Sequence, residues 1–147
     1  MGGAERFNGA SIRLGVLPER HDSVVCLLFD GDRPVLVRHR ERAWEFPGGH
    51  AEPGEAIEAT VRREAREEAG AELGEVHVAG HYVLAGGHTT VVTHARVRAL
   101  HPLSGAFETL EVRAFDALPE ALLSWDDGIY DHLLRALGLP GAAPLRG

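Results

Sequence analysis

The sequence predicts a mixed α+β domain in which a mixed β-sheet lies between helices. Short apolar or alternating segments, which are typical of strands, recur around two segments with helical periodicity. Strands and helices alternate unevenly, which favours a layered α/β or α+β architecture. A chain of 147 residues is long enough for one domain with its own core. We expect a single domain over residues 1–139 and a flexible tail over residues 140–147.

The expected strands differ in their burial. Residues 10–17 alternate between apolar and polar side chains, which indicates one buried face, whereas residues 24–29 are continuously apolar, as in a central strand. Asp30 and Gly31 form a hairpin turn signal that leads into a return strand at residues 34–37. Further strands are expected at residues 77–85, 89–100 and 112–115.

Helices are expected in two regions. Residues 44–49, WEFPGG, interrupt regular structure because proline and paired glycines demand special backbone angles. A helix follows at residues 56–69 and ends at Gly70, a suitable C-terminal cap. A short helix is expected after residues 118–119, and an amphipathic one at residues 127–137.

Composition and charge exclude some classes of function. The formal net charge of −7 argues against broad binding of nucleic acids. The apolar runs are too short to span a bilayer, so no membrane partner is expected. The single cysteine, Cys26, lies in an apolar run and is predicted to be buried in a reducing compartment. We therefore expect a cytoplasmic protein.

The helix at residues 56–69 carries an unusual acidic face. Glu64, Glu67 and Glu68 are spaced i, i+3 and i+4, so they share one side of a helix. A divalent cation such as Mg²⁺ would relieve their repulsion. Charge spacing alone favours a solvated surface helix with internal ion pairs. The glycines that precede the helix favour a binding site over a solvated surface, because they let the backbone and a phosphate approach closely.

One spaced pattern covers this whole region. Its form is G-x5-E-x7-R-E-U-x-E-E-x-G-U, where U is a bulky aliphatic residue. The two aliphatic positions hold the smaller Ala65 and Ala71. With the WEFPGG segment before it, the stretch resembles the Nudix hydrolase family, and the resemblance extends over roughly residues 10–135. It implies a Nudix-type α/β/α sandwich. All fixed positions are filled, by Gly49, Glu55, Arg63, Glu64, Glu67, Glu68 and Gly70.

The resemblance also implies roles for these residues. Nudix enzymes cleave a pyrophosphate bond in a nucleoside diphosphate linked to another group, with Mg²⁺ or Mn²⁺ bound. Glu67 and Glu68 are implied as the principal metal ligands, and Glu64 as a ligand or proton acceptor. The carbonyl group of Gly48 would complete the coordination. Structural support is implied for Gly49, Glu55, Arg63 and Gly70, with Glu55 and Arg63 forming a pair.

Many family members use a further glutamate outside this motif as a base or an extra ligand. Glu108 and Glu111, in the segment AFETLEVRAF, are the candidates, and the sequence does not separate them. Either one could equally be a solvent-facing loop acid.

Substrate contacts are expected elsewhere in the chain. Arg38, Arg40 and Arg42 alternate, so they could share one face of a strand and hold a polyphosphate, or form an exposed basic edge. Trp125 and Asp126 are similar to a Trp-Asp-Asp segment of the branch that hydrolyses 8-oxo-dGTP, where they would contact the base. Alternatively, Trp125 packs under the last helix and Asp126 or Asp127 caps it.

The sequence therefore predicts a metal-dependent pyrophosphohydrolase of a nucleotide. A (deoxy)nucleoside triphosphate such as an oxidised purine dNTP is the favoured substrate, giving a monophosphate and pyrophosphate. The alternatives are an RNA 5′-pyrophosphohydrolase and a non-catalytic nucleotide sensor with the same fold. A homodimer is possible.

Overall fold

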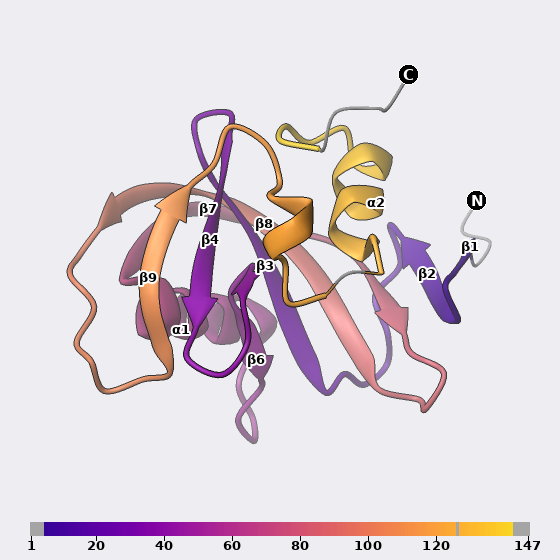
Figure 1. The fold of residues 1–147 in the computed structure, drawn as a ribbon. Coiled ribbons are helices and arrows are strands. Elements are labelled where there is room, and N and C mark those ends of the chain that lie inside the picture. The colour runs from indigo at the N-terminus through magenta and orange to yellow at the C-terminus, as the bar shows by residue number, and fades with distance from the viewer. Residues whose placement is uncertain (1–4, 126, 143–147) are drawn as a thin grey trace.

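The protein folds into one curved β-sheet with a helix on each side (Figure 1), as the sequence predicts. The computed structural model describes residues 5–125 and 127–142. Within these residues the helices are α1 (Ile57–Ala69) and α2 (Ile129–Ala136), with a short 3-10 helix, η1 (Glu120–Leu122). The strands are β1 (Glu5–Phe7), β2 (Ala10–Leu14), β3 (Ser23–Asp30), β4 (Arg33–His39), β5 (Trp44–Glu45), β6 (Gly48–His50), β7 (Ala71–Val83), β8 (Thr89–Leu100) and β9 (Thr109–Ala114).

Strand β3 is the centre of the sheet. The strand order is β1-β2-β7-β8-β3-β4-β5, with β6 also paired to β3 and β9 to β4. The β3–β8 pair is parallel, whereas β3 runs antiparallel to β4 and β6, so the sheet is mixed as expected. The strand is continuously buried from Ser23 to Phe29, which explains its unbroken apolar sequence.

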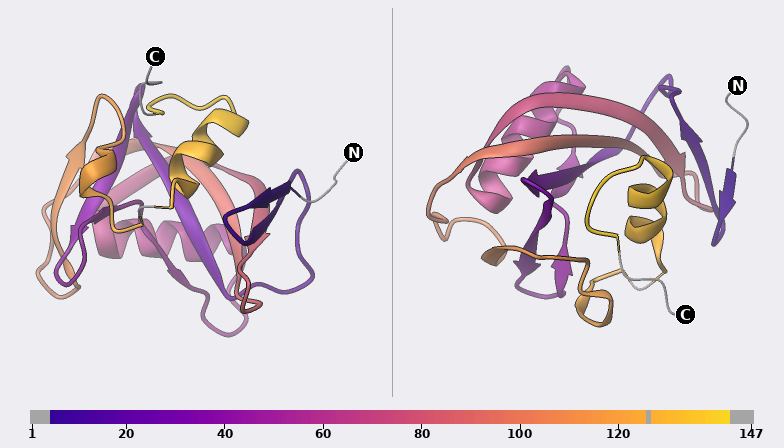
Figure 2. Two further views of the ribbon diagram at one scale, coloured as in Figure 1. Left: turned by 45° about the vertical axis from the view of Figure 1, so that its right-hand side comes forward. Right: turned by 90° about the horizontal axis from the view of Figure 1, so that it is seen from above.

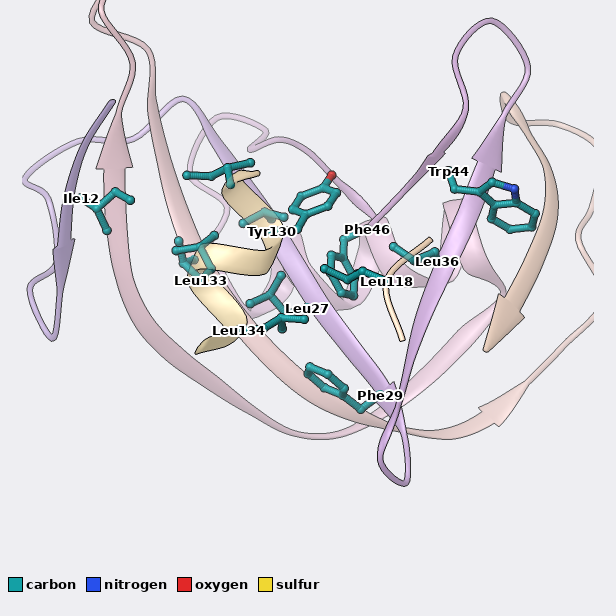
Figure 3. Close-up of a cluster of buried hydrophobic side chains, with 13 residues drawn as sticks. Ile12, Leu27, Phe29, Leu36, Trp44, Phe46, Leu118, Tyr130, Leu133 and Leu134 are labelled. Carbon is teal, nitrogen blue, oxygen red and sulfur yellow. The ribbon is translucent and has the colours of Figure 1, made fainter. Parts of the chain in front are cut away.

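Alternate side chains of β3 enter two separate cores. Cys26 and Leu28 pack with Val61 and Ala65 of α1 on one face. The small Ala65 is fully buried, so the reduced volume at this motif position brings the helix close to the sheet. On the other face, Leu27 packs with the α2 side of the molecule in the cluster drawn in Figure 3. Figure 2 shows the long strands β7 and β8 passing between the two helices.

Several element boundaries differ from those predicted. The hairpin turn is Gly31 and Asp32, because Asp30 still pairs with Arg33. Residues 44–50 are not wholly irregular, since they contain β5 and β6. Strand β7 begins six residues before the predicted position 77. The sequence did not predict these residues because β-bulges between 72 and 80 interrupt the alternation of buried and exposed side chains. Strand β9 starts at Thr109, and the predicted strand at residues 10–17 ends at Leu14.

The ends of the described chain pack on the domain. Strand β1, which the sequence did not indicate, pairs with β2 at one edge of the sheet. At the other end, the amide of Leu118 donates to the carbonyl of Gly141, and Ala142 packs against the α2 core. The predicted tail thus begins with packed residues, and its positions 143–147 lie outside the described residues. Among the described helices, none is long and apolar enough to cross a membrane.

Truncation of Leu133 tests the α2 core. Its side chain is fully buried against the sheet. Leu133→Ala should lower the free energy of unfolding by about 2–5 kcal/mol, because it removes buried methyl groups and leaves a cavity. Urea denaturation measures this. Leu122 is 55% exposed, so Leu122→Ala is the matched control, with an expected change within about 0.5 kcal/mol. Equal effects would mean that α2 does not dock as described.

Candidate active site

Two glycines bring strand β6 against both β3 and α1. A Cβ atom at Gly48 would collide with the carbonyl oxygen of Val24 on β3. A Cβ atom at Gly49 would lie 2.6 Å from the carboxylate of Glu64 on α1. Any larger residue at either position would push the strand away. The glycines are therefore required by close packing, and they place backbone next to the acidic face of the helix.

The helix ends at a defined residue. Gly70 adopts a left-handed conformation with φ of 63°, and its amide donates to the carbonyl of Arg66. A Cβ atom there would also collide with the carbonyl oxygen of His101 at the end of β8. The predicted cap at Gly70 thus turns the chain directly from α1 into β7.

Arg63 is the cation that organises the acidic face. Its guanidinium donates to both carboxylate oxygens of Glu55, from Nε at 2.7 Å and from Nη2 at 2.9 Å. Nη1 donates to Glu64 Oε1 at 2.8 Å and to Glu67 Oε2 at 3.3 Å. The predicted pairing of Glu55 with Arg63 is present, and it ties the loop before α1 to the helix itself.

The carboxylates have opposite electrostatic environments. Hydrogen bonds from Arg63, then from the amide of Glu52 and the hydroxyl of Thr60, lower the pKa of Glu55 to about 2. Burial raises the pKa of Glu64. Burial also raises the pKa of Glu68 to about 8, and neighbouring Glu64 adds to the shift. A bond from the amide of Gly48 to Glu68 Oε1, at 2.8 Å, opposes it.

The donor chemistry of this face fits a hard divalent cation. Glu64, Glu67 and Glu68 supply carboxylate oxygens, the ligands that Mg²⁺ and Mn²⁺ prefer. Burial raises the pKa of both Glu64 and Glu68 because it disfavours their ionised forms, and a bound cation would favour those ionised forms. Within the described residues, no group of three aspartate, glutamate, histidine or cysteine side chains is close enough together to hold a metal ion as it stands. A cation would have to draw these oxygens away from Arg63 and from the Gly48 amide.

A pocket lies on the opposite side of the two glycines from α1. It has a volume of about 590 Å³ and is bordered by Gly48 and Gly49 together with aromatic side chains of Phe46, Tyr82, Trp125 and Tyr130. Strand β6 is thus a thin partition between this aromatic pocket and the carboxylates of α1. A larger groove of about 930 Å³ is lined by residues such as His77, His94 and Arg96, and the acidic face of α1 does not border it.

The loop that carries Trp125 is fastened to the strand segment before the glycines. The amide of Ala43 donates to Ser124 Oγ at 2.9 Å, and this hydroxyl donates to Glu45 Oε1 at 2.9 Å. Trp125 is 46% exposed and lies in the pocket wall. Asp126, the other expected base contact, lies outside the described residues. Asp127 Oδ1 accepts the amide of Ile129, the first residue of α2, at 3.1 Å, although the N-cap position itself is Gly128.

The three arginines expected to hold phosphate do not share a strand face. Strand β4 ends at His39, so the alternation that relates Arg38 to the other two is lost beyond it. Arg38 pairs with Glu111 at 3.3 Å, and Arg40 lies in the exposed segment after β4. Arg42 donates twice to the buried Glu45, at 2.8 and 3.1 Å. Binding of phosphate by these arginines stays a prediction, and none of them lines the pocket.

The two candidate glutamates outside the motif lie on different faces. Glu111 pairs with Arg38 and Arg113, and the Arg113 guanidinium lies 5.0 Å from the ring of Trp44, on the α2 side. Glu108 immediately precedes Thr109, whose hydroxyl donates to the backbone carbonyl of Glu68 on α1, and its own carboxylate contacts the buried His39. The structure therefore brings Glu108, and not Glu111, near the acidic helix.

Three residues near the site were not anticipated. Glu45 is only 7% exposed and lines the pocket, Tyr130 borders it, and the buried His39 contacts Glu108. The amphipathic pattern of α2 could have indicated that Tyr130 faces inward. Glu45 and His39 carried no such signal, since charged and imidazole side chains are usually exposed.

Comparisons with known proteins agree with this fold. The sequence model of the NUDIX domain family matches residues 19–133. The chain therefore belongs to the NUDIX domain family. It is 34% identical over 106 residues to YtkD of Bacillus subtilis (strain 168), which carries the provisional name of an 8-oxo-dGTP diphosphatase. This match covers 70% of the chain and 66% of YtkD.

Two further similarities are more limited. The NAD-capped RNA hydrolase NudC of Mycobacterium tuberculosis (strain ATCC 25618 / H37Rv) is 40% identical over 67 residues, which is 43% of this chain and 21% of NudC. The chain thus spans less than two thirds of the length of these two relatives. The crystal structure of the Bacillus subtilis pyrophosphohydrolase BsRppH superposes with a TM-score of 0.77 at 24% identity, over 88% of this chain and 90% of that one. At that identity it shows the fold alone.

The Glu55–Arg63 pair predicts how stability depends on pH. The pKa of Glu55 falls from its ordinary 4.5 to about 2 in the folded protein. Its ionised form therefore stabilises the fold above pH 4.5, and that contribution is lost as pH falls towards 2. Urea denaturation should show Glu55→Gln less stable than the wild type at pH 7, with a difference that narrows below pH 4.5. A difference that is constant between pH 7 and 3 would exclude the ion pair as its cause.

Proposed function

We propose that this chain is a divalent-metal-dependent pyrophosphohydrolase that cleaves a pyrophosphate bond in a nucleoside diphosphate derivative. One observation carries the proposal. Only the strand with Gly48 and Gly49 separates the carboxylates of Glu64 and Glu68 from an aromatic pocket of nucleoside size. A nucleotide whose base lies in the pocket would extend its phosphates towards the carboxylates.

The acidic face explains why a cation is needed. Phosphates and the α1 carboxylates repel each other, so both can occupy the site only with positive charge between them. Mg²⁺ or Mn²⁺ would neutralise phosphate charge and acidify water. Glu67 and Glu68 are the proposed principal ligands, with the Gly48 carbonyl beside them and Glu64 as ligand or proton acceptor. Arg63 and Glu55 brace this set from the helix start.

The proposed substrate is a (deoxy)nucleoside triphosphate such as an oxidised purine dNTP, which would give a nucleoside monophosphate and pyrophosphate. Tyr82, Trp125 and Tyr130 offer ring faces to a base, and Glu45 and Asp127 offer carboxylates to its polar edge. The similarity to YtkD supports the same substrate class.

Two alternatives would use the same fold differently. An RNA 5′-pyrophosphohydrolase would apply this chemistry to a longer substrate, and the likeness to BsRppH does not favour it because that likeness shows the fold alone. A non-catalytic nucleotide sensor would not require every motif carboxylate, yet all are present here. The cytoplasmic location stays a prediction, and the homodimer stays a possibility that the sequence left open.

A substrate panel would separate these functions. The purified chain is incubated with Mg²⁺ or Mn²⁺ and with dNTPs, oxidised dNTPs, sugar nucleotides, dinucleotides and 5′-triphosphorylated RNA. We expect fastest release of pyrophosphate from an oxidised purine dNTP. Faster turnover of RNA would favour the RNA enzyme, and tight nucleotide binding without any product would favour the sensor.

Loss of the proposed ligands should remove both metal binding and turnover. Glu67→Gln and Glu68→Gln should each lower kcat by at least about 100-fold. In the wild type, Mg²⁺ at 100 times its Kd should stabilise the folded protein by about 2.7 kcal/mol and so raise Tm. Both variants should lose this rise in Tm. Calorimetry and pyrophosphate release measure the two effects. Glu58→Gln is the control, because Glu58 is exposed and pairs with Arg62. If Mg²⁺ raised the Tm of the Glu67 and Glu68 variants as much as that of the wild type, these residues would not be metal ligands.

Trp125 tests the assignment of the pocket to the base. Trp125→Ala should raise KM for a purine nucleotide by roughly 5- to 150-fold, which corresponds to the loss of about 1–3 kcal/mol of stacking. Tm should change little, since the ring is 46% exposed. Trp125→Phe, which keeps a ring, should retain most of the affinity. Steady-state kinetics of the wild type and the two variants measures KM. An unchanged KM in the alanine variant would mean that the base binds elsewhere.

A further inference from the structure

A β-bulge sets the position of Glu108. Strands β4 and β9 pair Arg38 with Glu111 but His39 with Thr109, so Leu110 is an extra residue on β9. Such a bulge changes the face to which the following side chains point. As a result Thr109 is buried towards α1, where its hydroxyl donates to the Glu68 carbonyl. Glu108 is thereby held one residue from a direct contact with the acidic helix.

The buried His39 contacts the Glu108 side chain. The amide of Glu41 donates to His39 Nδ1 at 3.1 Å, so Nδ1 must be the unprotonated nitrogen of the ring. Nε2 then carries the hydrogen and donates to Glu108 Oε2 at 2.8 Å. The imidazole is only 4% exposed, whereas the Glu108 side chain is 71% exposed. A rigid donor therefore fixes the carboxylate of an otherwise solvated side chain.

The backbone around the pair reinforces this arrangement. The amide of Arg40 donates to the backbone carbonyl of Glu108 at 2.7 Å. The end of β4 and the residue after it therefore hold both the backbone and the side chain of Glu108. Hydrogen bonds to Glu45 raise the pKa of the Arg42 guanidinium, burial opposes this rise, and the charges of Glu68 and Glu108 make smaller contributions to it.

We infer that His39 is a positioning residue that holds the Glu108 carboxylate at the Glu68 end of α1, where Glu108 accepts the proton of the attacking water. This inference rests on the proposed function. The water oxygen forms a bond to phosphorus, the bridging P–O bond breaks with its electron pair on the departing phosphate, and the water proton passes to Glu108. A carboxylate has about four lone-pair sites, so the bond from His39 leaves others to accept this proton.

Variants of His39 test the inference. His39→Leu removes the donor, whereas His39→Gln keeps an N–H donor on a side chain of similar length. We expect His39→Leu to lower kcat by about 10- to 100-fold with KM nearly unchanged, and His39→Gln to recover most of kcat. His77 on β7, whose Nε2 lies 4.0 Å from Glu75, is the matched control; His77→Leu should leave kcat unchanged. Tm of each protein shows whether it is folded.

A double-mutant cycle with Glu108→Gln separates positioning from a general structural effect. If His39 acts through Glu108, His39→Leu should cause no further loss of kcat in the Glu108→Gln background. Equal kcat for His39→Leu and wild type would overturn the inference, and so would a loss that adds fully to that of Glu108→Gln. If the leucine variant does not fold, His39→Asn, whose shorter amide does not reach Glu108, takes its place in the same cycle. Absence of any turnover by the wild type would instead overturn the proposed function.

Discussion

The close contact of Gly48 and Gly49 with their neighbours is the constraint on which the site depends. A side chain at either position would collide with the backbone of β3 or with the carboxylate of Glu64. Without that contact, β6 could not lie between the acidic face of α1 and the aromatic pocket. The paired glycines therefore do more than form a turn, because they reduce the wall between the two halves of the site to a single strand of backbone.

Positive charge is distributed unequally over the acidic face. Arg63 contacts Glu55, Glu64 and Glu67, but Glu68 is bound by the neutral amide of Gly48. Hydrogen bonds from Arg63 lower the pKa of Glu55 to about 2, whereas burial raises that of Glu68 to about 8. Glu55, in the loop before α1, stabilises the fold through its pair with Arg63. Glu68 lies on the helix without an arginine partner among the described residues, which is consistent with its proposed role as a metal ligand.

The sequence predicted features that depend on near neighbours and missed those that depend on distant pairing. The helix, its cap at Gly70 and the Glu55–Arg63 pair lie within sixteen consecutive positions, so their spacing was sufficient. The choice between Glu108 and Glu111 depends on a bulge in the pairing of β9 with β4, some 70 residues away. Arg42 likewise pairs with a glutamate whose burial is decided by tertiary packing. Alternation in sequence could not reveal a strand that ends at His39.

Reaction and substrate choice are built from different parts of this chain. The carboxylates come from one continuous helix that packs on one face of the sheet. The pocket is assembled on the other face from β3, β6, β7, β8 and the start of α2, and its Trp125 wall is fastened by Ser124 and Glu45. If the pocket holds the base, as proposed, substitutions in that wall would alter which base is accepted without moving α1, because the two faces have separate cores. Glu45 is the exception, since it lines the pocket and its charge also raises the pKa of Glu68.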